Sequence, residues 1–275
     1  MGAFTTTTAI VLVVLGFGVG VLGTLVGAGG GFILTPILLV AYPHDSPQTI
    51  TAISIGVVFF NAASGSVAYA RQRRIDYRSG IVFAVATMPG AVAGALAVSH
   101  VPRRAFDAIM VVLLLAMATW LFAGTRGAAP LRSRGTRRTV VDAQGNESVY
   151  HVPLVLGALF SVGVGFVSSF LGIGGGIIHV PLLVQAFGFP VHVATATSHF
   201  VLVFMSGTGT VTHLLQGSYH VGHGLRRTLA LSAGVIAGAQ LGARISLRIS
   251  GTGIQRVLAV SLVALALRLA ATVLT

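Results

Sequence analysis

The chain has 275 residues, of which 55% are hydrophobic and 8% are charged, and its formal net charge is +12. Soluble domains carry about 25% charged residues, so this composition excludes an ordinary soluble domain and predicts an integral membrane protein. All 17 basic residues are arginines, mostly in short segments between apolar runs, which indicates cytoplasmic loops and not nucleic-acid binding.

The first apolar run covers residues 9–42 and contains the sequence GAGGGFILTP at 27–36. As one helix the run would be about 51 Å long, whereas the hydrocarbon core of a bilayer is about 30 Å thick. Each of the three consecutive glycines costs about 1 kcal/mol in a helix. We therefore expect the helix to break at residues 27–31. Pro36 suits the first turn of a second helix.

Three further apolar spans follow in the first half, at about residues 49–70, 80–99 and 105–123. The first of these spans carries Ser54 and Asn61, and the arginines from Arg71 to Arg78 that close it indicate a cytoplasmic loop. We expect residues 1–125 to form an N-terminal membrane repeat. Residues 126–150 are expected to form a cytoplasmic linker, in which 139–150 are predicted to fold as a β-hairpin around a Gly-Asn turn.

The second half, residues 151–275, repeats the first as a C-terminal membrane repeat. Residues 163–184 align with 18–39 without a gap, with ten identical positions of 22. The predicted fold is an all-α polytopic membrane protein with two homologous halves of four apolar segments each, the first segment of each half being broken by glycines. If each broken run crosses once, there are about eight spans and the halves are parallel. If each is a pair of crossings, there are ten spans and the repeats are inverted. The arginine distribution favours eight.

The duplicated glycine breaks are the predicted substrate site. Backbone N–H groups at the start of a helix lack partners and carry about half a positive charge, so such an end binds anions. The residues expected to bind substrate are Gly29, Gly30, Gly31, Gly174, Gly175 and Gly176, with the nearby polar side chains Ser54, Asn61, Thr197, Ser198 and His199. The alternative is that the glycines only let helices touch.

The same idea predicts backbone conformation. We expect a positive φ at Gly30 and Gly175, where a side chain would strain the chain and fill the site. We expect helical φ at Gly20 and Gly165, where alanine should be tolerated unless a neighbouring helix lies very close.

Two other functions are compatible with parts of the sequence. A transition-metal permease could use the intramembrane histidines His179, His199 and His213, with His220 and His223 as further candidates, although the chain has no cysteine and few carboxylates. An intramembrane serine hydrolase could use Ser198 or Ser206 with His199 or His213, but a single catalytic dyad gives no reason for duplicated glycines. We expect no enzyme activity, no cofactor and no bound metal.

The repeated motif Gly-x-Gly-Gly-Gly-x-Ile-x-x-Pro-x-Leu, at 27–38 and 172–183, and the Thr-Ser element after it resemble the sulfite exporter TauE/SafE family. This family is also called the toluenesulfonate uptake permease family. The resemblance implies a multi-pass transporter of the bacterial inner membrane that moves a sulfur-containing anion such as sulfite or a sulfonate. The expected partners are that anion and the lipid bilayer, and a second copy of the chain in a homodimer is a further possible partner. In the first half the element reads Ala52-Ile53-Ser54 instead of Thr-Ser.

Overall fold

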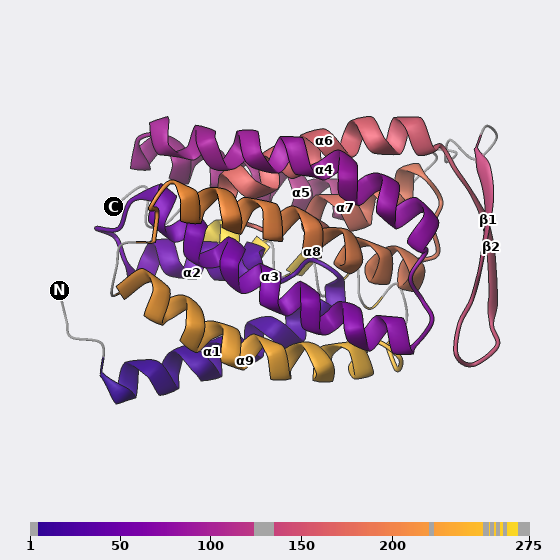
Figure 1. Ribbon diagram of the computed structural model, residues 1–275, viewed down its shortest axis with the longest axis horizontal. Helices are drawn as coiled ribbons and strands as arrows, with labels where there is room; N and C mark the ends of the chain where they lie inside the picture. The colour runs from indigo at the N-terminus through magenta and orange to yellow at the C-terminus, as the bar shows by residue number, and fades with distance from the viewer. Residues whose placement is uncertain are drawn as a thin grey trace.

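The computed structural model describes residues 5–123, 135–219 and 223–249, together with 253, 256, 259–260 and 263–268. In this part of the chain the structure is a helical bundle with a two-stranded hairpin at one end (Figure 1). The elements of the first half are α1 (Thr6–Val26), α2 (Gly31–Ala41), α3 (Pro47–Arg71), α4 (Tyr77–Ala97), η1 (Val98–His100) and α5 (Arg103–Ala123). Those that follow are β1 (Thr136–Val141), β2 (Glu147–Val152), α6 (Leu154–Leu171), α7 (Gly176–Pro181), η2 (Leu182–Ala186), α8 (Val191–Leu215) and α9 (His223–Ile245).

The bundle has the surface of a membrane protein. Among the described residues, 5 helices are long and apolar enough to cross a bilayer, and the two shorter apolar helices Gly31–Ala41 and Gly176–Ala186 follow the glycine breaks. Large apolar side chains point outward, and Val155 and Val14 are 78% and 66% exposed. Such faces are stable in lipid and not in water. The prediction of an all-α polytopic membrane protein is confirmed, while the number of crossings stays a prediction.

Both glycine breaks lie where the sequence predicted them. α1 ends at Val26 and is capped by Gly27, which has φ 79°, and α2 begins after Gly30, which has φ 82°. α6 ends at Leu171 and is capped by Gly172 with φ 69°, and α7 begins at Gly176. Left-handed residues of this kind are common helix ends, and glycine adopts them without steric cost. Pro36 lies inside α2 and not in its first turn.

Two helices of each half pack against helices of the other half. α1 packs along α9, and α4 packs along α6 (Figure 1). Gly16 of α1 lies against Leu231 of α9. One turn later, Gly20 lies against Val235, so the numbers rise together and these two helices are parallel. The same order holds along α4 and α6.

α3 and α8 occupy equivalent places in the two halves and run in opposite directions. Gly65, near the end of α3, lies against His199, near the start of α8. Ile55, earlier in α3, lies against Gly209, later in α8. The halves are therefore inverted, and our preference for parallel halves is wrong. The reason is local, because each break turns the chain back: a Cβ on Gly23 would lie 2.5 Å from the Cα atom of Gly30.

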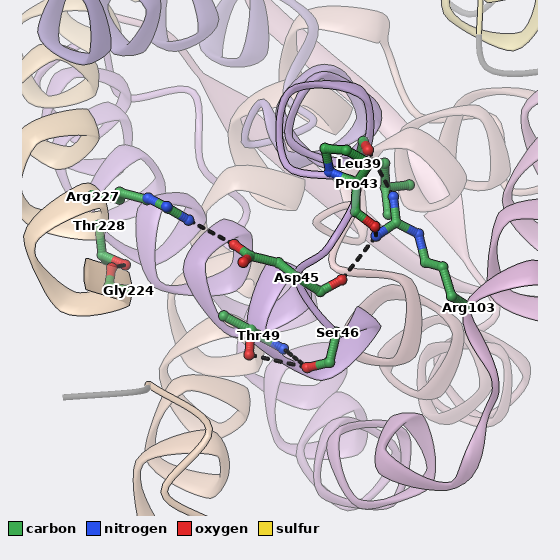
Figure 2. Close-up of polar contacts among 9 residues, drawn as sticks. All are labelled: Leu39, Pro43, Asp45, Ser46, Thr49, Arg103, Gly224, Arg227 and Thr228. Atoms are coloured by element: carbon green, nitrogen blue, oxygen red, sulfur yellow. Dashed lines mark hydrogen bonds and ion pairs between the residues drawn. The ribbon is translucent and has the colours of Figure 1, made fainter. Parts of the chain in front are cut away.

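Two arginines fix the far end of α2 (Figure 2), which lies at the opposite end of the bundle from the hairpin (Figure 1). Arg103 donates to the carbonyl oxygen of Leu39 at 2.7 Å and to that of Asp45 at 2.8 Å. Arg227 pairs with the Asp45 carboxylate at 2.6 Å and lies 3.7 Å from the ring centroid of Tyr42. The last carbonyls of a helix lack partners within it. Arg103 therefore supplies a hydrogen-bond donor to a carbonyl in the last turn of α2 and fixes where this helix ends.

Inversion changes the predicted side of one arginine pair. α9 begins at the end of the bundle where α3 begins, because Arg227 pairs with Asp45. The hairpin lies at the other end, where the N–H of Ala143 donates to the carbonyl of Gln72 at 3.0 Å. With parallel halves, Arg226 would be on the hairpin side. In the structure it lies on the opposite side.

We therefore predict opposite labelling of the variants Gln144→Cys and Arg226→Cys, which replace two exposed residues in a chain without native cysteine. An impermeant thiol reagent applied to intact cells should modify the Arg226→Cys variant and not the Gln144→Cys variant, because the arginine-rich hairpin end is expected in the cytoplasm. Lysed cells, in which both variants react, provide the control. Protection of both variants in intact cells would contradict the inverted arrangement.

Candidate functional site

The two glycine breaks cross at the centre of the bundle and pack directly on each other. A Cβ on Gly31 would lie 2.6 Å from the carbonyl oxygen of Gly172, and one on Gly174 would lie 2.8 Å from that of Ala28. Every residue of 27–31 and 172–176 is buried. Backbones approach this closely only where side chains are absent. The fold thus brings together the predicted glycines Gly29, Gly30, Gly31, Gly174, Gly175 and Gly176.

One apolar pair lies against both breaks. A Cβ on Gly29 would lie 2.7 Å from Leu202 Cδ2 and 2.9 Å from Val58 Cγ1. A Cβ on Gly174 would meet the same two atoms, at 3.3 Å and 3.1 Å. Val58 and Leu202 are fully buried, on α3 and α8 respectively. The pseudo-twofold axis between the halves therefore passes close to this pair, which closes the crossing.

The conformations of the two breaks differ at one position. Positive φ is found at Gly27, Gly29 and Gly30 in the first break, and at Gly172 and Gly174 in the second. The expectation for Gly30 is confirmed. The expectation for Gly175 is wrong, because this residue has φ −57°. The second break returns to right-handed backbone one residue earlier, so the left-handed glycine before α7 is Gly174.

The helices that restart after the breaks begin with unpaired N–H groups. The first backbone bonds of α2 run to the carbonyl of Gly30. Among the described residues, the N–H groups of Gly31 and Phe32 have no acceptor, nor do those of Gly176 and Ile177 in α7. These groups carry the partial positive charge of a helix N-terminus. Both sets lie at the crossing and are buried there.

The predicted serines hold the breaks in place from matching positions. Ser54 on α3 donates to the carbonyl of Gly172 at 2.6 Å, and Thr35 on α2 donates to the same oxygen at 2.6 Å. Ser198 on α8 donates to the carbonyl of Gly27 at 3.1 Å. A buried carbonyl released from a helix needs such a donor. Both serines therefore bond the backbone of the opposite half.

Asn61 and His199 meet at the end of α1. The hydroxyl of Thr24 donates to Asn61 Oδ1 at 3.1 Å and lies 3.3 Å from His199 Nε2. The backbone carbonyl of Thr24 accepts a hydrogen bond from Tyr69 at 2.7 Å. Asn61 Nδ2 and His199 Nδ1 are buried and, within the described residues, have no partner. Two polar nitrogens thus remain available close to the first break.

Sequence reasoning missed a matching polar group in the second half. Ser168 and Ser169 at the end of α6 have buried hydroxyls without partners among the described residues. A Cβ on Gly175 would lie 3.1 Å from Ser168 Oγ and 3.0 Å from Met205 Sδ. Ser169 is the repeat equivalent of Thr24, so the alignment of the two halves carried the signal.

Thr197 is not part of the crossing. Its hydroxyl accepts the N–H of Asp76 at 3.0 Å, because successive residues of a helix point in different directions. The Asp76 carboxylate accepts hydrogen bonds from Tyr150 at 2.9 Å and Ser79 at 2.6 Å, and Arg138 lies 4.0 Å away. Burial raises the pKa of the Tyr150 phenol, and the nearby carboxylate raises it further. Asp76 therefore joins the hairpin to α8, which the sequence did not indicate.

In the part of the chain that the structure describes, the histidines do not gather into a metal site. Among the described residues, no three His, Asp or Glu side chains lie close enough to hold an ion. His179 lies 3.5 Å from the hydroxyl of Ser161, and His213 lies 3.2 Å from that of Ser218. Each of the three intramembrane histidines is thus placed beside a different hydroxyl group.

The serines considered as hydrolase nucleophiles donate their hydroxyl hydrogens to backbone carbonyl groups. Ser198 donates to the carbonyl of Gly27, and Ser206 donates to the carbonyl of Leu202. The hydrogen-bonding neighbour of His199 is Thr24. A nucleophile needs a general base within hydrogen-bonding reach, and the hydrogen bonds of these three residues in the described structure do not supply such a pair.

Comparison with known proteins gives a consistent result. The family model of the sulfite exporter TauE/SafE matches residues 12–269. The probable membrane transporter protein YunE of Bacillus subtilis is 32% identical over 245 residues, which cover 86% of this chain and 88% of YunE. The probable membrane transporter protein MJ0441 of Methanocaldococcus jannaschii is 26% identical over 249 residues, covering 87% and 86% of the two chains. No solved structure matches the chain significantly.

The hairpin contact gives a prediction about stability. Tyr150→Phe should release β2, because it leaves the buried Asp76 carboxylate short of one hydrogen bond, which costs about 1–3 kcal/mol. Amide hydrogen exchange of residues 147–152 should become faster. Tyr77→Phe is the matched control, since Tyr77 is exposed and next to Asp76 in the chain. Equal exchange in the two variants would show that this hydrogen bond does not hold the hairpin.

Proposed function

The chain belongs to the sulfite exporter TauE/SafE family of membrane transporters, and we propose that it carries a small sulfur-containing anion across the cytoplasmic membrane. It is a multi-pass membrane protein. Sulfite, a sulfonate or a related organic anion is the proposed substrate. The proposed site is the crossing of the two glycine breaks, between the inverted halves.

The observation that carries this proposal is the meeting of two helix N-termini. The unpaired N–H groups of Gly31 and Phe32 lie beside the chain of the second break, and those of Gly176 and Ile177 lie beside the first. Such N–H groups bind anions through hydrogen bonds and the helix dipole. They do so without a buried arginine, which costs about 2.5–3.5 kcal/mol on insertion scales. Discontinuous helices near the midplane are a known solution in transporters.

Neighbouring side chains add polar groups suited to an anion. Asn61 Nδ2 is a donor without a partner in the described structure. Because the Thr24 hydroxyl donates to Asn61, the His199 ring meets Thr24 through a protonated Nε2, and its Nδ1 becomes a donor only when the imidazole takes up a second proton. The hydroxyls of Ser168 and Ser169 are free to donate in the other half, within the part of the chain that the structure describes. A sulfur oxyanion has several acceptor oxygens, and hydrogen bonds to an ionised acceptor are about twice as strong as neutral ones. This set favours an oxyanion over a metal cation.

In the proposed pathway, the observed arrangement would be a closed form. Val58 and Leu202 are fully buried against both breaks. Substrate entry requires these two side chains to separate from Gly29 or from Gly174. Because α3 and α8 are inverted equivalents, the same movement in one half and then in the other would open the site to alternate sides. Alternating access through inverted repeats works in this manner.

The direct test is flux into proteoliposomes that contain the purified protein. Radiolabelled sulfite should enter faster than into empty vesicles, and an unlabelled sulfonate should compete while chloride should not. A parallel arm measures uptake of Ni²⁺. If Ni²⁺ enters and no sulfur anion of the panel does, the metal-permease alternative replaces this proposal.

The glycines of the crossing supply the second test, and the structure changes the choice of control. Alanine at Gly20 was expected to be tolerated unless a neighbouring helix lies very close, and α9 does, because a Cβ would lie 2.7 Å from the Cα atom of Val235. At Gly165 a Cβ would meet the carbonyl of Thr87. These glycines let helices touch, so alanine at either position would separate the helices. By contrast, a Cβ on Gly18 or Gly163 meets nothing within 4 Å.

We predict that Gly29→Ala and Gly174→Ala each reduce flux roughly tenfold or more, while Gly18→Ala and Gly163→Ala leave it unchanged. The positive φ at both crossing positions costs alanine about 1–2 kcal/mol, and each added methyl fills the crossing. Flux is compared at equal amounts of folded protein, measured by size-exclusion chromatography. Full flux in both crossing variants would place the substrate elsewhere.

A further inference from the structure

A second polar cavity lies outside the crossing, between the hairpin and the membrane body. It has a volume of about 280 Å³ and is bounded by the end of α3, the hairpin and the start of α8. Its lining residues are Arg74, Val140, Asp142, Asn146, Ser148, Pro190, His192 and Val193. The hairpin turn is fixed over it by the hydrogen bond from the N–H of Ala143 to the carbonyl of Gln72.

Arg74 is the unusual feature of this cavity. Its side chain is only 8% exposed, and NH1 has no hydrogen-bond partner among the described residues. The described structure gives it no carboxylate within the 4.0 Å that defines an ion pair. Burial lowers the pKa of the Arg74 guanidinium. A buried charge without a hydrogen-bonded partner is costly, so an anion in the cavity would stabilise this arrangement.

Two other groups at this cavity also favour a negatively charged ligand. His192 Nδ1 is buried and has no partner among the described residues, and it donates when that nitrogen carries the proton. α8 starts at Val191 without a side-chain cap, and its first backbone bond runs from Ala194 to Pro190. The N-terminus of this long helix therefore faces the cavity with free N–H groups and its positive dipole end.

One carboxylate opposes an anion here. Asp142 accepts hydrogen bonds from the backbone N–H groups of Gln144 and Asn146 and from the Asn146 side chain. The side-chain bond from Asn146 lowers the pKa of Asp142, which keeps it ionised. Asp142 thus shapes the hairpin turn, and although its charge attracts Arg74, no hydrogen bond between the two satisfies NH1 of Arg74.

We propose that this cavity is a second anion-binding site, which takes a small oxyanion such as sulfate or sulfite on Arg74, His192 and the start of α8. Guanidinium binds oxyanions through paired N–H···O bonds. From His192 to Ser198 is six residues, about 9 Å along α8, so the site lies one to two turns from the crossing. If this second site delivers substrate to the crossing from the hairpin side, that role rests on the proposed function. The binding of an anion at the second site does not depend on it.

The test uses Ser148→Cys, a half-buried position in the cavity wall, and measures alkylation by a neutral maleimide in the purified full-length protein. Inorganic sulfate, balanced with gluconate to constant ionic strength, should slow the reaction several-fold. Gln144→Cys on the exposed turn is the matched control and should react equally with and without sulfate. Equal slowing in both variants would mean a salt effect and would overturn the proposal.

Further variants in the Ser148→Cys background identify the groups that bind. Arg74→Gln should abolish protection, while Arg71→Gln, which removes an exposed arginine three residues earlier, should preserve it. Asp142→Asn should shift protection to lower sulfate concentrations, and a misfolded protein would not gain affinity in this way. Protection that persists in Arg74→Gln, or that weakens in Asp142→Asn, would overturn the site.

The transport role is separated from binding by flux. Arg74→Gln should raise the KM for sulfite in proteoliposomes and leave kcat unchanged, since the crossing is intact. Sulfate protection of the Ser148→Cys thiol in a protein that moves no sulfur anion would support the second site and contradict the proposed function. Normal sulfite flux without any sulfate protection of the thiol would support the proposed function and contradict the second site.

Discussion

Backbone polar groups that leave a helix at membrane depth must find partners inside the protein, and the crossing of the glycine breaks is how this protein meets that requirement. The carbonyls of Gly27 and Gly172 are each held by a serine, Ser198 and Ser54, from the opposite half. The carbonyls are thus satisfied, and the N–H groups of the restarting helices remain unpaired within the described structure. We propose that this asymmetry lets the centre of the bundle bind an anion without a charged side chain.

The inverted repeat follows from the same breaks. Because each break turns the chain back, the first helix of each half packs against the third long helix of the other, α1 with α9 and α6 with α4. Glycines such as Gly20 and Gly165 let these pairs touch at backbone distance. Each half therefore completes the other, and the two breaks necessarily meet on the axis that relates α3 to α8.

The two ends of the bundle are built differently. At one end, Arg103 and Arg227 fix the loop after α2 through Leu39 and Asp45. At the other end the hairpin is bonded through Asp76 to Thr197, next to Ser198 of the crossing. A movement at the crossing would therefore be transmitted to the hairpin directly, whereas it would reach the opposite end of the bundle only through α2. This difference gives an otherwise symmetric transporter two distinct faces.

The sequence alone determined the membrane class, the internal repeat, the position of both breaks and the grouping of their glycines, because composition, period and glycine runs are local properties. It could not decide the direction of the halves, since that depends on whether a break continues or reverses the helix. Gly175 and Thr197 show the same limit: a φ angle and a side-chain direction are set by what packs against them. Asp76 and Arg74 appeared as loop residues, and only the tertiary structure, by docking the hairpin on α3, α4 and α8, buried them.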